Sequence, residues 1–265
     1  MEMEVLMITL SKTDDEYLND DGIPCCKNCK TPRYFIRENF ITRCKCKCQM
    51  EEIKRQEELE RQEKIKEYLK NLKEQSLLGE RYRNCSFDNM QIVNQEHKNI
   101  VERLKTYCTG FKNNNNGLGI YLFGKSGSGK TFLTACMLDK LNSQFIECMF
   151  TNISSLKEEI LNNKKQKDFI KKITTVPVLF IDDFGTEIYK KNSDDNWVQE
   201  LTYNIINTRY NNCLPIIYTS NYSLKECLEN RGLANKTIDR IFETTVQIKL
   251  DLPSFRLKEK KNIYF

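Results

Sequence analysis

Residues 124–131 read Gly-Lys-Ser-Gly-Ser-Gly-Lys-Thr, which fits the GxxxxGK(S/T) pattern of a phosphate-binding loop. The glycines let backbone N–H groups turn inward around a phosphate, and Lys130 can reach the β- and γ-oxygens of a triphosphate. The Thr131 hydroxyl can join the Mg²⁺ shell, and a helix that begins at Lys130 would point its positive dipole end at the same anion. The alternative interpretation is a glycine turn with a stray lysine. The residues predicted to bind the triphosphate are Gly124, Lys125, Ser126, Gly127, Ser128, Gly129, Lys130 and Thr131.

A pair of carboxylates follows a second apolar segment. Residues 178–181 (VLFI) are typical of a buried strand, and Asp182 and Asp183 come directly after it. In such a pair the first acid holds Mg²⁺, usually through water, and the second can orient and deprotonate an attacking water. An acidic pair after a strand is often only a polar strand end, but its position downstream of a phosphate loop favours a Walker B motif.

Small polar residues end a third apolar segment, which reads IIYTSN at 216–221. Because the carboxyl ends of parallel strands lie on one edge of a sheet, we expect Asn221 to emerge beside Asp183. A neutral amide can position water there without adding charge, whereas the alternative is an asparagine that only opens a turn.

Arginines are a fourth group of candidates. A planar cation that stays charged can stabilise the charge that develops on a γ-phosphate. Surface arginines are common, so the residue type alone does not select among them. The candidates are Arg209, Arg231, Arg240 and Arg256.

The candidate side chains can meet only if the strands that carry them end at a common edge of one sheet. The sequence pattern in the second half of the chain predicts such strands. From about Arg81 onward, apolar segments alternate with helical patterns, which predicts an α/β fold with a parallel sheet covered on both faces. The predicted strands are 118–123, 147–151, 177–181, 215–219 and 245–250.

Composition excludes several classes of protein. The 265 residues include 42 basic and 37 acidic ones, so the net charge is small. Binding of a polyanion would therefore need a local cluster of basic residues. No apolar run reaches the roughly 18–20 residues of a membrane span, and the N-terminus lacks the features of a secretory signal. Twelve cysteines without such a signal predict a reducing, cytoplasmic location, and the single histidine, His97, argues against histidine-based catalysis.

Six of the cysteines lie within the first 48 residues. Cys26 and Cys29 form a CxxC pair, and a second pair comes from Cys44, Cys46 and Cys48. This spacing predicts a tetrahedral thiolate zinc site, without which such a short segment could scarcely fold. Free reduced thiols and an iron–sulfur cluster are the alternatives.

The chain divides by composition into three predicted domains. Residues 1–48 form the cysteine-rich zinc-binding domain, 49–80 a charged helical linker, and 81–265 the nucleotide-binding domain. Between 49 and 76 there is no glycine or proline, and opposite charges recur at i,i+4, which predicts a solvated helix of about 40 Å.

Seven strings, in this order and spacing, resemble the DnaC/DnaI-type helicase loaders, a branch of the AAA+ ATPases. The strings are SFDNM (86–90), LGIYLFGKSGSGKTFL (118–133), VLFIDDFGTE (178–187), IINTRY (205–210), TSN (219–221), DR (239–240) and SFR (254–256). The resemblance implies a lidless AAA+ P-loop core with a five-stranded parallel sheet, a nucleotide site completed by another protomer, and head-to-tail self-association. It also implies that the N-terminal domain docks on the hexameric replicative DNA helicase.

The same resemblance implies roles for individual residues. Asp182 and Asp183 would be Walker B, Asn221 sensor 1 and Arg256 sensor 2, and Arg240 would be the arginine finger, with Arg231 as the competing candidate. Thr131 and Asp182 would hold Mg²⁺. The zinc ligands would be Cys26, Cys29, Cys46 and Cys48, with Cys44 as a competitor.

We therefore expect a weak ATPase that converts ATP and water to ADP and phosphate, is stimulated by assembly on single-stranded DNA and loads the helicase. Five lysines between the second and third predicted strands are candidates for DNA contact, although a charge run is usually a solvated face. These lysines are Lys164, Lys165, Lys167, Lys171 and Lys172. The alternatives are an IstB-type transposition helper and a nucleotide-dependent DNA-binding scaffold with little turnover.

Overall fold

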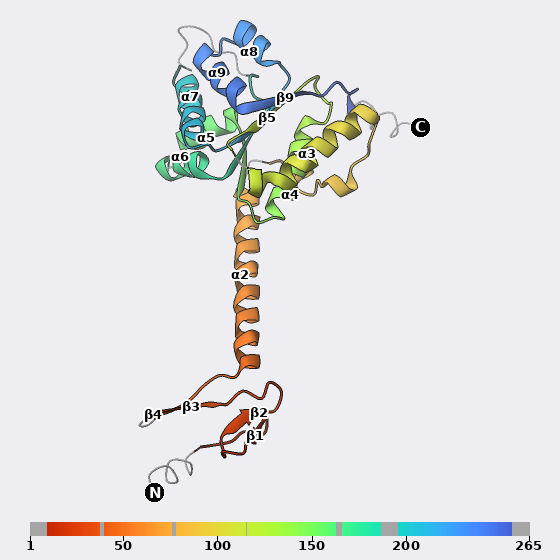
Figure 1. Cartoon of the computed structure of the whole chain (residues 1–265). Helices are drawn as coiled ribbons and strands as arrows, with labels where there is room; N and C mark the ends of the chain where they lie inside the picture. The colour runs from red at the N-terminus through yellow and green to blue at the C-terminus, as the bar shows by residue number, and fades with distance from the viewer. Residues whose placement is uncertain are drawn as a thin grey trace. The chain divides into compact units, whose positions relative to one another are not determined.

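A computed structural model describes residues 10–37, 40–75, 78–114, 116–162, 166–186 and 196–255 (Figure 1). The chain divides into two compact units, 1–66 and 67–265. No helix among the described residues is long and apolar enough to cross a membrane.

The N-terminal unit contains two short antiparallel pairs of strands. In the first, β1 (Glu16–Leu18) pairs with β2 (Pro24–Cys26), and in the second, β3 (Tyr34–Arg37) pairs with β4 (Phe40–Arg43). Two-stranded ribbons of this size bury little apolar surface and are at best marginally stable in water. Other interactions must therefore hold this unit together.

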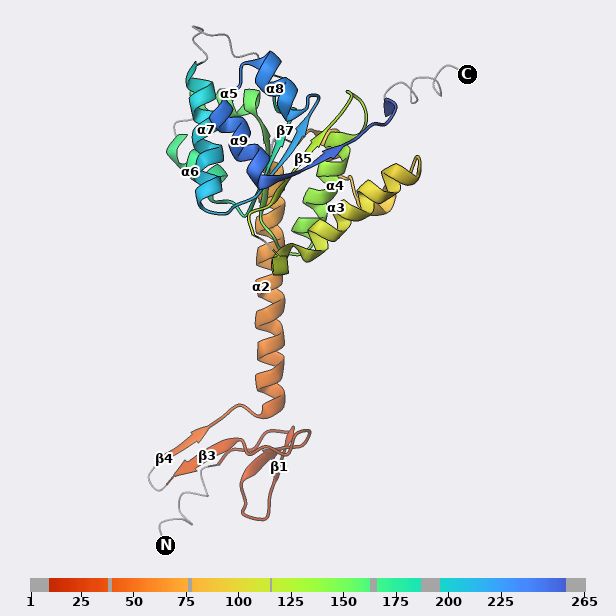
Figure 2. The same ribbon diagram turned by 45° about the horizontal axis from the view of Figure 1, so that its top comes forward.

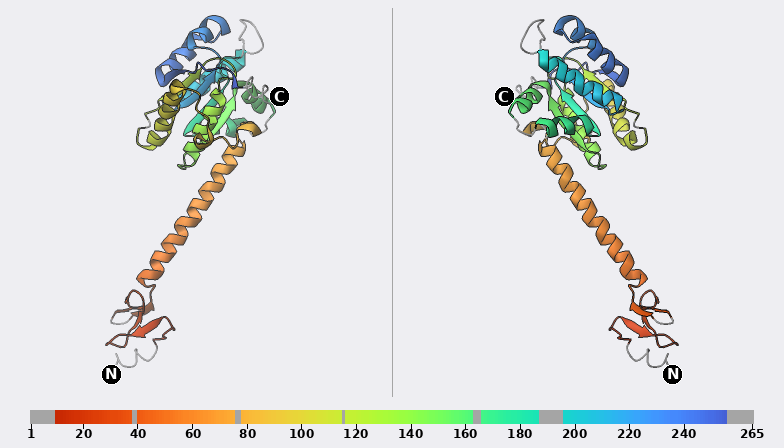
Figure 3. Two further views of the ribbon diagram at one scale, coloured as in Figure 1. Left: turned by 90° about the vertical axis from the view of Figure 1, so that its right-hand side faces the viewer. Right: turned by 90° about the vertical axis from the view of Figure 1, so that its left-hand side faces the viewer.

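A single charged helix, α2 (Lys47–Gln75), follows the second pair of strands (Figure 3). Its 29 residues confirm the predicted helix, although it begins and ends a few residues before the linker boundaries of 49 and 80. Local ion pairs such as that between Arg55 Nη2 and Glu52 Oε1, at 3.0 Å, contribute to its stability. The division between the two units falls inside this helix, and the three domain boundaries stay predictions.

The second unit is built on a five-stranded parallel sheet in the order β6-β7-β8-β5-β9. The strands are β5 (Gly119–Phe123), β6 (Cys148–Asn152), β7 (Val178–Asp182), β8 (Ile216–Ser220) and β9 (Thr245–Lys249). All five lie within one residue of the predicted ranges. The first four are almost wholly buried, as expected of strands that helices cover on both faces.

Helices cover both faces of this sheet (Figure 2). The helical segments are η1 (Glu80–Tyr82), η2 (Phe87–Asn89), α3 (Gln95–Asn114), α4 (Lys130–Asn142), α5 (Ile153–Asn162), α6 (Gln166–Thr175), α7 (Asn196–Asn211), α8 (Leu224–Arg231) and α9 (Asn235–Thr244). One apolar cluster packs α3 and α4 against the sheet through residues such as Leu104 and Leu138. The other joins the opposite face to α5–α9 through residues such as Ile206 and Ile241. The predicted α/β class and parallel sheet are confirmed.

Candidate nucleotide site and candidate metal centre

The phosphate-binding loop lies between the end of β5 and the start of α4. Gly124 is glycine for a steric reason, because a Cβ there would lie 2.2 Å from the Leu250 carbonyl oxygen. Gly129 precedes the helix with a φ of 94°, in the left-handed region that favours glycine. Lys130, which is buried, then begins α4, so the lysine and the amino end of the helix share the same small volume.

The Lys130 ammonium group is held by three oxygen atoms. Its Nζ donates hydrogen bonds to the carbonyls of Gly124 (2.9 Å) and Lys125 (3.0 Å) and to Asn221 Oδ1 (2.8 Å). A buried ammonium at the amino end of a helix is suited to an anionic ligand. The Ser128 hydroxyl in the same loop is buried and has no hydrogen-bond partner among the described residues. Both observations fit the oxygens of a phosphate.

Asp182, the last residue of β7, lies against the start of α4. Thr131 Oγ1 donates to its carboxylate at 3.0 Å and 3.2 Å, and Thr219 Oγ1 donates to Oδ1. Burial raises the pKa of Asp182, while the bonds from Thr219 and Thr131 and the charge of Lys130 oppose that rise. A divalent cation would favour the ionised form of this carboxyl, and the hydroxyl and carboxylate together are oxygen donors of the kind that Mg²⁺ takes.

Thr219 is a residue whose role the sequence did not reveal. Its Oγ1 accepts the N–H of Asp183 at 2.9 Å while donating to Asp182, and its carbonyl accepts the N–H of Phe184 at 2.8 Å. Asp183 has a φ of 50°, in the left-handed region that a non-glycine residue seldom adopts. Thr219 thus holds both the carboxylate and the backbone of the acidic pair. The available signal was the pair of hydroxyl residues, Thr219 and Ser220, that ends an apolar strand.

The carboxyl end of β8 joins the phosphate loop to the acidic pair. The Ser220 carbonyl accepts the Gly124 N–H at 3.2 Å, and its hydroxyl donates to the Phe184 carbonyl at 2.7 Å. Asn221, one residue further, contacts Lys130. These contacts arise because β8 lies between β7 and β5 in the sheet. The structure therefore brings together Lys130, Thr131, Asp182 and Asn221, with Asp183 next to Asp182 and exposed.

The arginine candidates differ in burial and in the groups that they contact. Arg209 is fully buried and donates at 2.8 Å to the carbonyls of Ile173, Val176 and Pro215. Burial lowers its pKa to about 10. The interpretation of Arg209 as a candidate for γ-phosphate contact is wrong, because its guanidinium satisfies backbone carbonyls inside the core.

Arg240 lies on α9 and stacks on an aromatic ring. Its guanidinium carbon is 3.9 Å from the centroid of the Tyr210 ring, and the Tyr210 hydroxyl donates to Glu243 Oε1 at 2.9 Å. These contacts join α9 to α7 rather than to the phosphate loop. Arg231 ends α8, but its side chain lies outside the described residues, as does Arg256 as a whole.

The chain just before Arg256 reaches the phosphate loop. The Phe255 N–H donates to the Gly127 carbonyl at 2.9 Å, and a Cβ on Gly127 would come within 2.2 Å of Ser254 Oγ. The segment that precedes the predicted sensor 2 therefore packs directly on the loop.

Four cysteines of the N-terminal unit form a compact group. The Sγ atoms of Cys26, Cys29, Cys46 and Cys48 all lie within 4.8 Å of one another. A tetrahedral zinc ion with Zn–S bonds of about 2.3 Å needs sulfurs about 3.8 Å apart, so the set fits that ion. Cys44 is not part of the group, and its thiol instead donates to the Pro32 carbonyl at 3.4 Å.

Hydrogen bonds and charges act on the thiols of this group. A hydrogen bond with the Thr31 hydroxyl lowers the pKa of Cys29 to about 5, whereas hydrogen bonding with Cys29 raises the pKa of Cys48 to about 12. Burial disfavours the charged form of Arg33, but its hydrogen bond to Cys46 and the charges of Cys46 and Glu16 raise its pKa overall. The unit thus places a cation beside sulfurs that must become thiolates to bind a metal.

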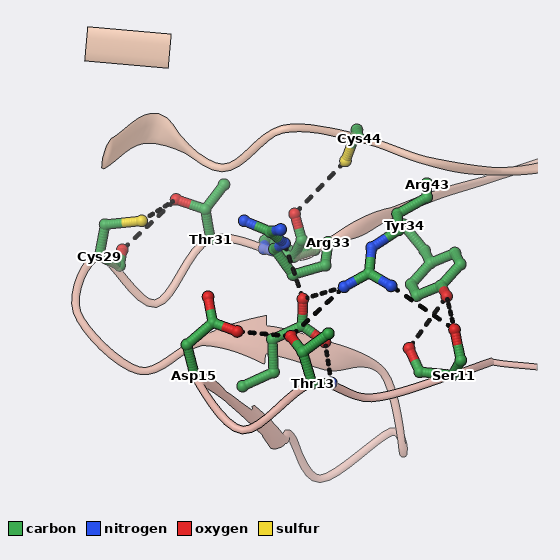
Figure 4. A network of polar contacts seen from close by, with 11 residues as sticks. Ser11, Thr13, Asp15, Cys29, Thr31, Arg33, Tyr34, Arg43 and Cys44 are labelled. Atoms are coloured by element: carbon green, nitrogen blue, oxygen red, sulfur yellow. Dashed lines mark hydrogen bonds and ion pairs between the residues drawn. The ribbon is translucent and has the colours of Figure 1, made fainter. Parts of the chain in front are cut away.

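A buried carboxylate ties the two strand pairs of this unit together (Figure 4). Glu16 on β1 is fully buried and pairs with Arg33 Nε at 2.8 Å and with Arg43 Nη2, at the end of β4, at 2.7 Å. Its other oxygen accepts the Thr13 N–H at 3.0 Å. This ion-pair network connects segments that share no extensive apolar core within residues 10–37 and 40–46.

The predicted DNA-contacting lysines are only partly described. Lys167, Lys171 and Lys172 lie on α6, with the first two exposed. Lys164 and Lys165 lie outside the described residues.

Comparison with known proteins gives matches along most of the chain. The family described as "IstB-like ATP binding protein" matches residues 42–263. The replicative helicase loader DnaI of Bacillus subtilis is 26% identical over 208 residues, which cover 73% of this chain and 64% of that protein. The chain thus aligns with less than two thirds of this relative's length.

Two solved structures show the same fold. A crystal structure of the DnaC helicase loader is 27% identical, with a TM-score of 0.55, and the match covers 65% of this chain and all of that one. AMPPCP-bound DnaA from Aquifex aeolicus is 19% identical, with a TM-score of 0.54, over 71% of this chain and 56% of that one. With the observed sheet order, these neighbours confirm the predicted AAA+ P-loop core.

Proposed function

Because the chain belongs to the family of IstB-like ATP-binding proteins, we propose that it is an ATP-dependent loader of the replicative DNA helicase. One observation carries this proposal: a chain that gathers Lys130, Thr131, Asp182 and Asn221 at one sheet edge also contains a compact four-thiol group. The edge supports a nucleotide-driven activity, and the thiol group supports an N-terminal docking domain. Similarity to DnaI and DnaC loaders supports the helicase as the partner.

In this proposal the nucleotide edge binds ATP with Mg²⁺. Residues 124–131 hold the phosphates, Thr131 and Asp182 hold the metal ion, and Asp183 orients and deprotonates water while Asn221 positions it. The metal ion, when bound, supplies a positive charge that neutralises the phosphate oxygens. The contacts of Lys130 with three oxygens and of Thr131 with Asp182 support these roles, because they assemble the predicted groups at one place.

Hydrolysis to ADP and phosphate would be weak in the single protomer and stimulated by assembly on single-stranded DNA. We assign the arginine finger to Arg240, acting on the site of a neighbouring subunit in a head-to-tail contact, and sensor 2 to Arg256. Arg240 contacts α7 rather than its own phosphate loop, which supports action in trans. The lysines of α6 and the preceding segment would contact the DNA strand.

Substitution Arg240→Ala tests the trans assignment. We expect unchanged binding of a fluorescent ATP analogue and loss of DNA-stimulated phosphate release, by a factor of about 10³ or more as for other arginine fingers. Arg103→Ala, at an exposed position of α3, is a matched control that should leave turnover unchanged. Loss of ATP binding together with turnover would contradict the assignment.

We place the three domains of this loader at 1–48, 49–80 and 81–265. The first would bind Zn²⁺ through Cys26, Cys29, Cys46 and Cys48 and dock on the hexameric helicase. Thiolate zinc sites persist where thiols are kept reduced, so the proposal places the protein in the cytoplasm.

Co-purification with the hexameric replicative helicase tests the loader proposal, with and without prior zinc chelation. We expect a complex that forms with the zinc-loaded protein and is lost after chelation, together with ATP-dependent transfer of the helicase to single-stranded DNA. A protein that retains zinc and ATP binding but neither binds nor loads the helicase would contradict it.

A transposition helper is the second candidate, favoured by the family description. The four-thiol group favours the loader over the transposition helper. Co-purification with a transposase rather than a helicase would favour the transposition helper instead.

A scaffold with little turnover is the third candidate. Steady-state phosphate release in the presence of single-stranded DNA separates it from an ATPase.

A further inference from the structure

One whole face of the β3–β4 hairpin is exposed to solvent. The register pairs Phe35 with Thr42 and Arg37 with Phe40. Since directly opposed residues and residues two apart share a face of a strand pair, all four side chains project on the same side. All four are exposed, Phe35 at 48% and Phe40 at 59%. We name this set the hairpin face.

The composition of the hairpin face limits what it can bind. It presents two aromatic rings, a guanidinium and a hydroxyl, and Arg37 already lies 5.4 Å from the centroid of the Phe35 ring. The aliphatic side chains of the hairpin, Ile36 and Ile41, lie on the opposite side. Flat π surfaces with a cation between them suit stacked bases next to a phosphate, whereas an apolar protein partner would be met by the aliphatic side.

Charge is segregated along the same unit. Residues 27–47 contain seven basic residues and one acidic residue, whereas residues 10–26 contain one basic and five acidic residues. Of the basic residues, Arg33 and Arg43 pair with Glu16, whereas Arg37, Lys45 and Lys47 are exposed. The hairpin and the chain that follows it therefore offer a basic surface, complementary to a polyanion.

We propose that the hairpin face binds single-stranded DNA. Bases would stack on Phe35 and Phe40, and Arg37 would pair with the phosphate between them. This contact is separate from the DNA contact assigned to the ATPase domain, and it gives the N-terminal unit a ligand of its own beyond helicase docking.

The test uses the full, zinc-loaded chain without nucleotide and a fluorescent thymine oligonucleotide. By anisotropy, the double variant Phe35→Ala/Phe40→Ala should bind at least tenfold more weakly, because each stacked base contributes about 1–3 kcal/mol. Phe35→Trp/Phe40→Trp should retain affinity. Arg37→Gln should reduce the slope of log K against log salt by about 0.7. Phe145→Ala, an exposed phenylalanine of the other unit, is the matched control and should leave affinity unchanged.

Photocrosslinking of the unmodified protein gives a second measurement that does not depend on the variants folding. With an oligonucleotide containing 5-iodouracil, we expect crosslinks at Phe35 or Phe40, located by mass spectrometry. Crosslinks confined to residues 67–265 would overturn the proposal. So would a double variant that retains zinc and full DNA affinity but no longer co-purifies with the helicase, because the face would then be a protein-docking surface. Helicase binding by the unmodified chain is measured separately. A failure of the loader proposal can therefore be told apart from a failure of the DNA-binding proposal for the hairpin face.

Discussion

The nucleotide edge and the thiol unit are held in place by different physics. The edge is the rim of a sheet whose strands are buried between two apolar clusters, so packed strands and helices position Lys130 and Asp182. The thiol unit has no comparable apolar cluster among its described residues; its buried residues there are three cysteines, Pro24 and the charged pair Glu16 and Arg33. One site is made by hydrophobic burial, and the other depends on its metal and its ion pairs.

The largest difference should appear on zinc removal. Chelation should unfold residues 10–46, because the binding free energy of a structural zinc site, about 10–16 kcal/mol, is also its folding free energy. ATP binding by residues 67–265 should be unchanged. Hydrogen exchange read segment by segment, with titration of a fluorescent ATP analogue, checks both parts. If the amides of residues 10–46 stay protected from hydrogen exchange after chelation, the thiol unit does not depend on its metal and the contrast with the nucleotide edge is wrong.

Glu16→Gln should destabilise the thiol unit by about 3–5 kcal/mol, because it leaves Arg33 and Arg43 without their buried partner. Competition with a chelator should show weaker zinc retention, and Asp20→Asn, at an exposed site, is the control.

The pH dependence of this unit has a definite sign. Burial alone would raise the pKa of Glu16, but its hydrogen bonds with Thr13 and its pairing with Arg43 lower it overall. The ion pair therefore stabilises the unit above the ordinary pKa of 4.5, and this contribution is lost as the pH falls through the lower folded-state value. Glu16→Gln should remove that part of the acid sensitivity, and an unchanged acid profile would contradict this.

Lys130→Ala should weaken ATP binding by roughly a hundredfold, equivalent to about 2.7 kcal/mol, since it removes the buried cation of the phosphate loop. Zinc content and the folding of residues 10–46 should not change. Equilibrium titration and metal analysis measure the two effects, and coupled loss of zinc would contradict the independence of the two sites.

Thr219→Val should produce the smallest effect, about 1–3 kcal/mol, because the Asp183 N–H and the Asp182 carboxylate lose a partner at constant volume. The Mg²⁺ concentration needed for half-maximal nucleotide binding should rise. Thr219→Ser keeps the hydroxyl and should behave as the unmodified protein. Equal effects of Val and Ser would show that packing, rather than the hydroxyl, matters at this position.

Local sequence patterns predicted much of this architecture. Strands β5 to β8 were predictable because each is a short, mostly apolar run, and the phosphate loop because its glycines and Lys130 have fixed spacing. The cysteine spacing predicted a four-thiol site but left the second pair open. Spacing reports which thiols are close along the chain, whereas the path of the chain from the end of β4 into the first turn of α2 decides which of them face inward.

The sequence by itself therefore determined the types of the reactive groups and the strands that carry them. Only the tertiary structure decided which of these groups meet. Arg209 and Arg240 are equivalent as residue types, yet one is buried against backbone carbonyls and the other lies on α9. The end of β8 links the acidic pair, through Thr219, to the phosphate loop, through Ser220 and Asn221, because β8 lies between β7 and β5. Strand order arises from packing between segments far apart in the chain, which local patterns do not encode.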